Sequence, residues 1–175
     1  RHGQVRVSRN AIYTLNQQQN PNLVFNGSSL PNWNLPQEGG IKDMTYKVYK
    51  MGKKRREAEF QRFPDFSKLT PQAQGSFETG WLDLKLAEME DNFGMVFEGR
   101  LEMGETGEYT FELASDDGSR LLIDGQPVVK ARAEVPGEAK IKLAAGSHTL
   151  RVEYFEAEGT ESLRAWWTGP DLVRT

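Results

Sequence analysis

The chain has 175 residues, a formal net charge of −3 and no cysteine. This mildly acidic balance gives no electrostatic basis for binding nucleic acid, because phosphate-binding domains carry a basic excess or a basic face. The lack of cysteine excludes disulfides, thiolate metal sites and a cysteine nucleophile. No apolar run approaches the ~20 residues that cross a bilayer, so we expect no membrane span.

The first forty residues are rich in Asn, Gln, Pro and Ser, with few apolar residues among them. This composition is typical of a linker or a loosely structured arm. We therefore predict an N-terminal arm or linker over residues 1–40 and a single domain over residues 41–175. The chain starts at Arg1, with no methionine and no signal-like apolar segment, and we expect it to be a module of a larger protein.

From Met44 onward, apolar and polar residues alternate in short runs, which is the signature of half-buried strands. These runs lie at residues 44–48, 93–101, 109–113, 121–123, 141–143, 150–154 and 163–167. Turn signals such as Asp124-Gly125 separate them, and no segment has a helical stripe of ten residues, although residues 84–89 fit one short turn. The pattern predicts an all-β fold, an antiparallel two-sheet β-sandwich that is jelly-roll-like, with an extended polar N-terminal arm.

Three segments in a fixed order resemble one family. They are GEYTFELASDDGSRLLIDG at 107–125, AGSHTLRVEYFE at 145–156 and LRAWW at 163–167. Together they resemble the PA-fourteen domain, a family named after a fragment of anthrax protective antigen. The resemblance covers about residues 44–170 and leaves residues 1–40 unexplained. It implies the fold more strongly than a function, because the family includes lectins, modules attached to glycosidases and adhesin tips.

The resemblance also implies a calcium site at Asp116 and Asp117. In sugar-binding members of the family, two consecutive aspartates joined by a cis peptide bond hold a calcium ion, and the ion binds sugar hydroxyls. Such an ion prefers about six to eight hard oxygen ligands. The alternative is an ordinary turn between strands, in which Gly118 supplies a positive φ. In the family-like context we favour metal binding.

The second loop of the expected site covers residues 156–162. Related sequences carry glycines and often an asparagine there, whereas this loop has one glycine and no asparagine. We expect the glutamates Glu158 and Glu161 to complete the metal ligands, and Glu156, Gly159 and Thr160 to join Asp116, Asp117 and Gly118 as sugar contacts. The alternative is that the three glutamates form a solvated acidic tip.

Adjacent tryptophans in the last predicted strand must point to opposite faces. Trp167 keeps the phase of the core residues, so we predict that it is buried. Trp166 is then a candidate platform for the apolar face of a sugar ring.

No nucleophile elbow, phosphate loop or zinc-binding histidine motif occurs, so we predict that the chain is not an enzyme, although it could be attached to one that processes glycosides. The leading hypothesis is a calcium-dependent carbohydrate-binding module of a larger extracytoplasmic protein, whether secreted, cell-surface or periplasmic. Its expected partners are a glycan or cell-surface polysaccharide and the other domains of the parent protein. The alternative is a structural or protein-interaction spacer that binds neither sugar nor metal.

Overall fold

The computed structural model describes residues 40–52, 63–77, 82–133, 135–159 and 161–169. These residues form strands almost throughout, with two short 3-10 helices. In chain order the elements are β1 (Gly40–Lys50), η1 (Phe66–Lys68), β2 (Ala73–Phe77), η2 (Leu84–Ala87), β3 (Phe93–Met103), β4 (Gly107–Asp116), β5 (Gly118–Ile123), β6 (Gln126–Arg132), β7 (Gly137–Leu143), β8 (Gly146–Glu156) and β9 (Ser162–Thr168).

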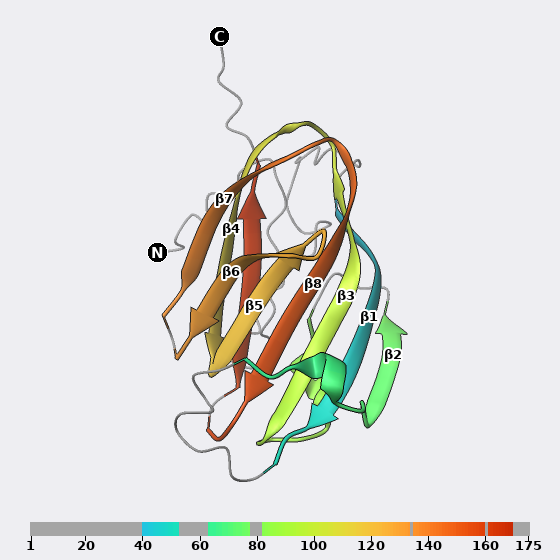
Figure 1. The fold of residues 1–175 in the computed structure, drawn as a ribbon, viewed down its shortest axis with the longest axis vertical. Helices are drawn as coiled ribbons and strands as arrows, with labels where there is room; N and C mark the ends of the chain where they lie inside the picture. The colour runs from blue at the N-terminus through green and yellow to red at the C-terminus, as the bar shows by residue number, and fades with distance from the viewer. Residues whose placement is uncertain (1–39, 53–62, 78–81, 134, 160, 170–175) are drawn as a thin grey trace, which may run out of the picture.

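The strands form two sheets that pack face to face (Figure 1). One sheet has six strands in the order β2-β1-β3-β8-β5-β6, and the other has three in the order β7-β4-β9. Every pairing between these strands is antiparallel. The predicted all-β fold of two antiparallel sheets is therefore confirmed.

Alternation along the strands places the core between the sheets. In β4, Tyr109, Phe111 and Leu113 are buried while the residues between them are half-exposed. In β8, Val152 and Tyr154 face the same interior. Each large apolar side chain removed from water contributes roughly 1.5–3 kcal/mol, so this double-sided core is the main source of stability.

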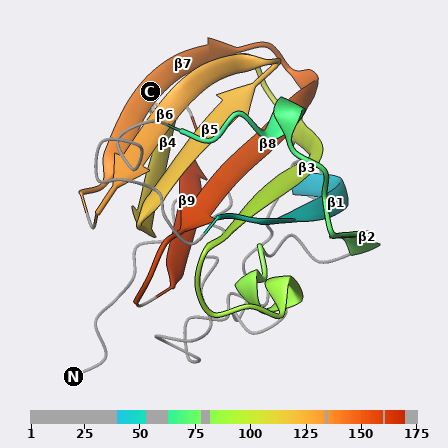
Figure 2. The same cartoon turned by 60° about the horizontal axis from the view of Figure 1, so that its bottom comes forward.

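A second apolar cluster covers one end of the outer face of the six-stranded sheet. Phe66 of η1 packs there against Tyr49, Val96 and Phe155, and the ring of Phe63 meets that of Phe155 edge-on at 5.2 Å. Figures 1 and 2 show this green segment crossing the strands from outside. The end of β8 is therefore packed on both faces, which fixes the backbone that enters the β8–β9 loop.

The turn between β5 and β6 is formed by Asp124 and Gly125, whose φ angles are +50° and +76°. Positive φ at both central residues is what a two-residue hairpin turn requires, and this is why an Asp-Gly pair predicts it. The side chain of Asp124 also accepts a hydrogen bond from the backbone N–H of Thr149 at 2.9 Å. The turn is thereby tied to the neighbouring strand β8.

The predicted N-terminal arm lies outside the described residues apart from Gly40, which already belongs to β1. Within the described part of the chain, no helix has the length and apolar character that crossing a membrane would need.

Candidate functional site at the β4–β5 and β8–β9 loops

Asp116 and Asp117 lie where the chain crosses from the three-stranded sheet to the six-stranded sheet. Asp116 ends β4 and Gly118 begins β5, so Asp117 alone separates the two strands. The peptide bond between Asp116 and Asp117 is cis. Asp116 pairs with Ser162 of β9, and Gly118 pairs with Phe155 of β8. The register therefore brings both predicted loops to one end of the sandwich.

Asp117 links the two loops directly. Its carboxylate oxygen Oδ2 accepts a hydrogen bond from the backbone N–H of Ala157 at 2.6 Å. Its carbonyl accepts another from the backbone N–H of Ala133 at 2.7 Å. A carboxylate held in this way has a fixed orientation, which a ligand site needs.

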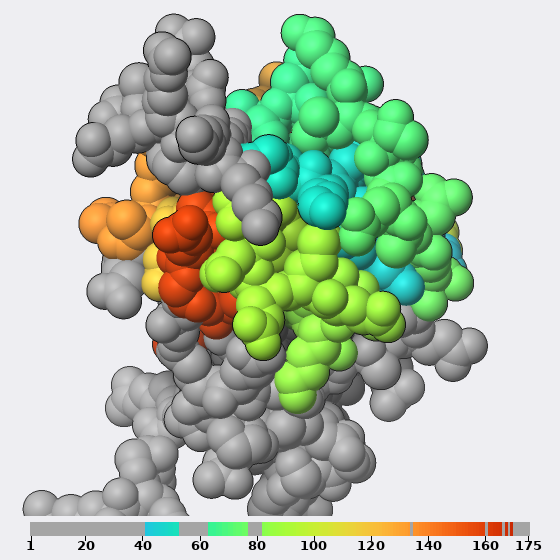
Figure 3. All heavy atoms as spheres, turned by 90° about the horizontal axis from the view of Figure 1, so that it is seen from below, coloured from blue at the N-terminus to red at the C-terminus, as the bar shows by residue number. Residues whose placement is uncertain are grey.

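The β8–β9 loop is held from its other side by the segment that precedes β3. The backbone N–H of Asn92 donates to the carbonyl of Ala157 at 2.9 Å. The backbone N–H of Gly159, whose φ is +119°, donates to Oδ1 of Asp91 at 3.2 Å. Figure 3, seen from this end, shows the red and yellow-green surfaces in direct contact. The loop thus forms a wall between Asp117 and the residues before β3.

A buried polar group lies beneath the aspartates. The hydroxyl of Tyr154 is 2.7 Å from the carbonyl oxygen of Asp116 and 2.6 Å from Oε2 of Glu156. One hydroxyl carries one proton, so it can donate to only one of these oxygens. If it donates to the Asp116 carbonyl, Glu156 must be protonated and donate to the Tyr154 oxygen.

The electrostatics agree with a protonated Glu156. Burial raises the pKa of Glu156 to about 8, and the negative charges of Asp117 and Asp116 raise it as well. The hydrogen bond with Tyr154 lowers this pKa but does not outweigh them. Burial also raises the pKa of Tyr154, which keeps the phenol neutral. Burial and the neighbouring aspartates therefore favour the protonated, neutral form of Glu156.

The second oxygen of Glu156, Oε1, is buried and has no hydrogen-bond partner within the described structure. Leaving such an oxygen unpaired costs about 1–3 kcal/mol, so a nearby cation or water would be stabilised there. This unsatisfied oxygen fits the hard-oxygen environment that calcium prefers.

Packing, and not turn geometry, requires glycine at position 118. It begins β5 and is buried, and a Cβ added to it would lie 2.3 Å from Cε1 of Phe155. Positive φ among the described glycines occurs at Gly125, Gly146 and Gly159 instead. The expectation of the turn alternative, a positive φ at Gly118, is therefore wrong.

The remaining predicted ligands are only partly gathered by the fold. Glu158 is exposed, and Glu161 is half-buried, with burial raising the pKa of its carboxyl and the charges of Glu90 and Asp91 raising it further. Among the described residues, no three or more His, Asp or Glu side chains are grouped to hold a metal ion. Calcium at this end would therefore depend on backbone, water or ligand oxygens as well as on carboxylates.

Two predicted contacts fall where the structure gives no description. Thr160 lies outside the described residues, and Trp166 belongs to β9 while its side chain is outside the described part. Trp167 is buried, as its phase predicts, and its ring stacks at 6.5 Å from that of Phe111.

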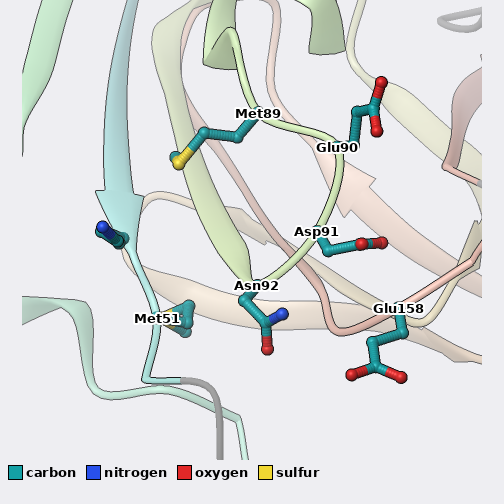
Figure 4. A pocket seen from close by; sticks show the side chains of 7 residues that line it. Met51, Met89, Glu90, Asp91, Asn92 and Glu158 are labelled. Atoms are coloured by element: carbon teal, nitrogen blue, oxygen red, sulfur yellow. The ribbon is translucent and has the colours of Figure 1, made fainter.

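A pocket that the sequence did not indicate opens beside the β8–β9 loop (Figure 4). Its volume is about 520 Å³, and it is lined by Lys50, Met51, Met89, Glu90, Asp91, Asn92 and Glu158. The lining comes from three separate parts of the chain, so no local motif marks it. The one sequence feature that could have indicated the pocket is the polar pair Asp91-Asn92 directly before β3.

The described residues form a β-sandwich with two acidic loops at one end. A family model for the PA14 domain matches residues 49–173, and the chain belongs to the PA14 domain family. This match confirms the resemblance that the three sequence segments indicated. A search of curated proteins found no match.

Several solved structures share the fold. One is the Epithelial Adhesin 9 A domain from Candida glabrata in complex with Galb1-4GlcNAc, with 15% identity, a TM-score of 0.53 and coverage of 78% of this chain and 85% of that chain. A subtype-switched Epithelial Adhesin 9 to 1 A domain from the same organism, in complex with beta-lactose, has 16% identity, a TM-score of 0.56 and coverage of 78% and 84%. An anti-sigma factor domain-containing protein from Clostridium clariflavum has 15% identity, a TM-score of 0.52 and coverage of 78% and 44%. Likeness at this level of identity establishes the fold alone.

Proposed function

We propose that this PA14 domain is a non-catalytic module that binds carbohydrate through a calcium ion held at Asp116 and Asp117. The observation that carries the proposal is the hydrogen bond from the backbone of Ala157 to the Asp117 carboxylate. It joins the two acidic loops into one fixed edge, as a shared ion and sugar site requires. Two similar structures are named as complexes with Galb1-4GlcNAc and beta-lactose, which supports a glycan as the ligand.

The donor set at this edge fits calcium. Asp116 and Asp117 would supply carboxylate oxygens, and the unpaired Oε1 of Glu156 is a further hard oxygen at this edge. Glu158 and Glu161 remain proposed contributors from the second loop. When bound, the ion would offer open coordination positions to sugar hydroxyls.

A binding role is favoured over catalysis by the state of Glu156. Its carboxyl group is buried and hydrogen-bonded to Tyr154, so it lacks the access to substrate that a general acid needs. The proposal includes a larger extracytoplasmic parent protein, to which the domain would supply glycan binding. The likeness to adhesin domains supports that placement.

The alternative is a spacer that binds neither sugar nor metal. One observation favours it, namely that the described residues contain no group of three acidic or histidine side chains placed around a metal. Calcium binding with no sugar binding would leave a structural role for the ion.

The proposal is tested by calorimetric titration of beta-lactose and Galb1-4GlcNAc into the protein, with calcium and with chelator. We expect binding only with calcium, and its loss in Asp116→Asn and Asp117→Asn. Glu138→Gln removes one exposed carboxylate from β7, a strand that contributes to neither loop, and should bind as the parent does. Sugar binding that persists in chelator would contradict the calcium-mediated mechanism.

A further inference from the structure

We propose that the pocket beside the β8–β9 loop is a subsite for a protonated amino group on the bound glycan. The module would then prefer sugars with a free amine over the same sugars in N-acetylated form. This inference rests on the proposed sugar binding and names the ligand class for that site.

The pocket and the proposed calcium site lie on the two sides of the β8–β9 loop. Ala157 is bonded to Asp117 on one side and to Asn92 on the other, and Asn92 lines the pocket. Gly159, two residues further, is bonded to Asp91, which also lines it. Two residues of chain span at most about 7 Å. A glycan fixed at Asp117 therefore has its neighbouring sugar units within reach of the pocket.

The shape of the pocket suits a sugar ring. Its volume of about 520 Å³ lies within the range of small-molecule sites, roughly 300–1,000 Å³. In Figure 4 the side chains of Met51 and Met89 lie on one side, and the carboxylates of Asp91 and Glu158 lie on the other. Met89 is half-buried, so its side chain offers an apolar surface to the C–H face of a ring, whereas the buried Met51 adds little surface.

The charge of the pocket selects the ligand. Glu90, Asp91 and Glu158 contribute three carboxylates against the single ammonium of Lys50. A recess with an excess of negative charge attracts an ammonium group and repels uronic acids or sulfated sugars. The carboxylate of Asp91 accepts a hydrogen bond from the backbone N–H of Gly159, which holds this negative charge in the lining of the pocket.

The test compares short oligomers of glucosamine with N-acetylated oligomers of the same length and linkage. Titrations use the whole chain with calcium at about pH 6, where amines are protonated. We expect the glucosamine oligomer to bind at least about threefold more tightly, as one or two partly exposed ion pairs allow. The preference should shrink with added salt, because exposed charges are screened.

Matched variants locate the effect. Asp91→Asn keeps an oxygen that can accept from Gly159, and Glu90→Gln keeps the side-chain length, so both remove charge with little change of shape. Each should reduce the preference for the free amine, whereas Glu138→Gln on β7 should retain it.

The outcomes separate this inference from the proposed function. Calcium-dependent binding of both oligomers with equal affinity would overturn the amine subsite and leave the calcium site standing. Failure of both oligomers and of beta-lactose to bind with calcium would remove the proposed function as well. Binding of oligolysine as tightly as the glucosamine oligomer would also overturn the inference, because the pocket would then attract any polycation.

Discussion

The buried hydroxyl of Tyr154 lies 2.7 Å from the carbonyl oxygen of Asp116, at the point where the chain crosses between the sheets. The same hydroxyl contacts the buried carboxyl group of Glu156. Tyr154 therefore supports the backbone of one loop and the side chain that leads into the other. The geometry of the proposed site depends on a residue that would not touch its ligand.

Replacing this hydroxyl should be costly. Tyr154→Phe leaves the Asp116 carbonyl and Glu156 short of a buried partner, so we expect a loss of about 2–4 kcal/mol in the free energy of unfolding. Tyr109→Phe is the matched control. The hydroxyl of Tyr109, near the start of β4, donates a single hydrogen bond of 2.7 Å to the carbonyl of Glu105. Urea unfolding of both variants measures the difference. Equal losses would show that Tyr154 has no special role.

Gly118→Ala should destabilise the domain by roughly 1–3 kcal/mol, because the added methyl group overlaps the buried ring of Phe155. Gly52→Ala is the control, as no atom lies within 4 Å of a Cβ built there. Thermal unfolding distinguishes the two. The double variant with Phe155→Leu should recover part of the loss, and purely additive effects would argue against the overlap as the cause.

His148 should make stability depend on pH at the opposite end of β8. Its ring nitrogens lie 2.7 Å from Oδ2 of Asp124 and 2.9 Å from the carbonyl oxygen of Ala144, and two acceptors require a doubly protonated ring. Burial lowers the pKa of His148, but these two hydrogen bonds and the charges of Asp124 and Glu102 outweigh it, and the pKa is raised.

Because the folded-state pKa of His148 lies above the unfolded value of about 6.5, its stabilisation is complete below that pH and is lost as the pH rises through the folded value. We expect roughly 0.5–1 kcal/mol after allowance for solvent screening. His148→Gln should remove this difference, measured by urea unfolding at about pH 5.5 and pH 8. An equal effect of the substitution at both pH values would contradict the assignment.

Much of the fold follows from local pattern, because a strand with one face in the core alternates regularly. Tyr109, Phe111 and Leu113 are of this kind, and Trp167 was placed in the core by the same phase. β2 (Ala73–Phe77) was not predicted. It is an edge strand that pairs only with β1, and its described side chains are exposed or half-buried, so it carries no alternation.

The candidate site was harder to predict, because its parts meet only in three dimensions. The Asp116-Asp117 pair stood out as a motif, but the burial of Glu156 follows from its position on the inner face of β8 beside Tyr154. The pocket joins residues 50–51, 89–92 and 158, and this grouping depends on strand register. No periodicity within one segment encodes it.

The central claim, that Asp116 and Asp117 hold calcium, is tested most directly by the melting temperature of the protein at increasing calcium. A ligand at about one hundred times its dissociation constant stabilises the folded state by about 2.7 kcal/mol. We predict a saturable upward shift of several degrees in the parent chain and in Glu138→Gln, and no shift in Asp116→Asn or Asp117→Asn. An unchanged melting temperature in the parent chain at millimolar calcium, with no heat of binding, would contradict the claim.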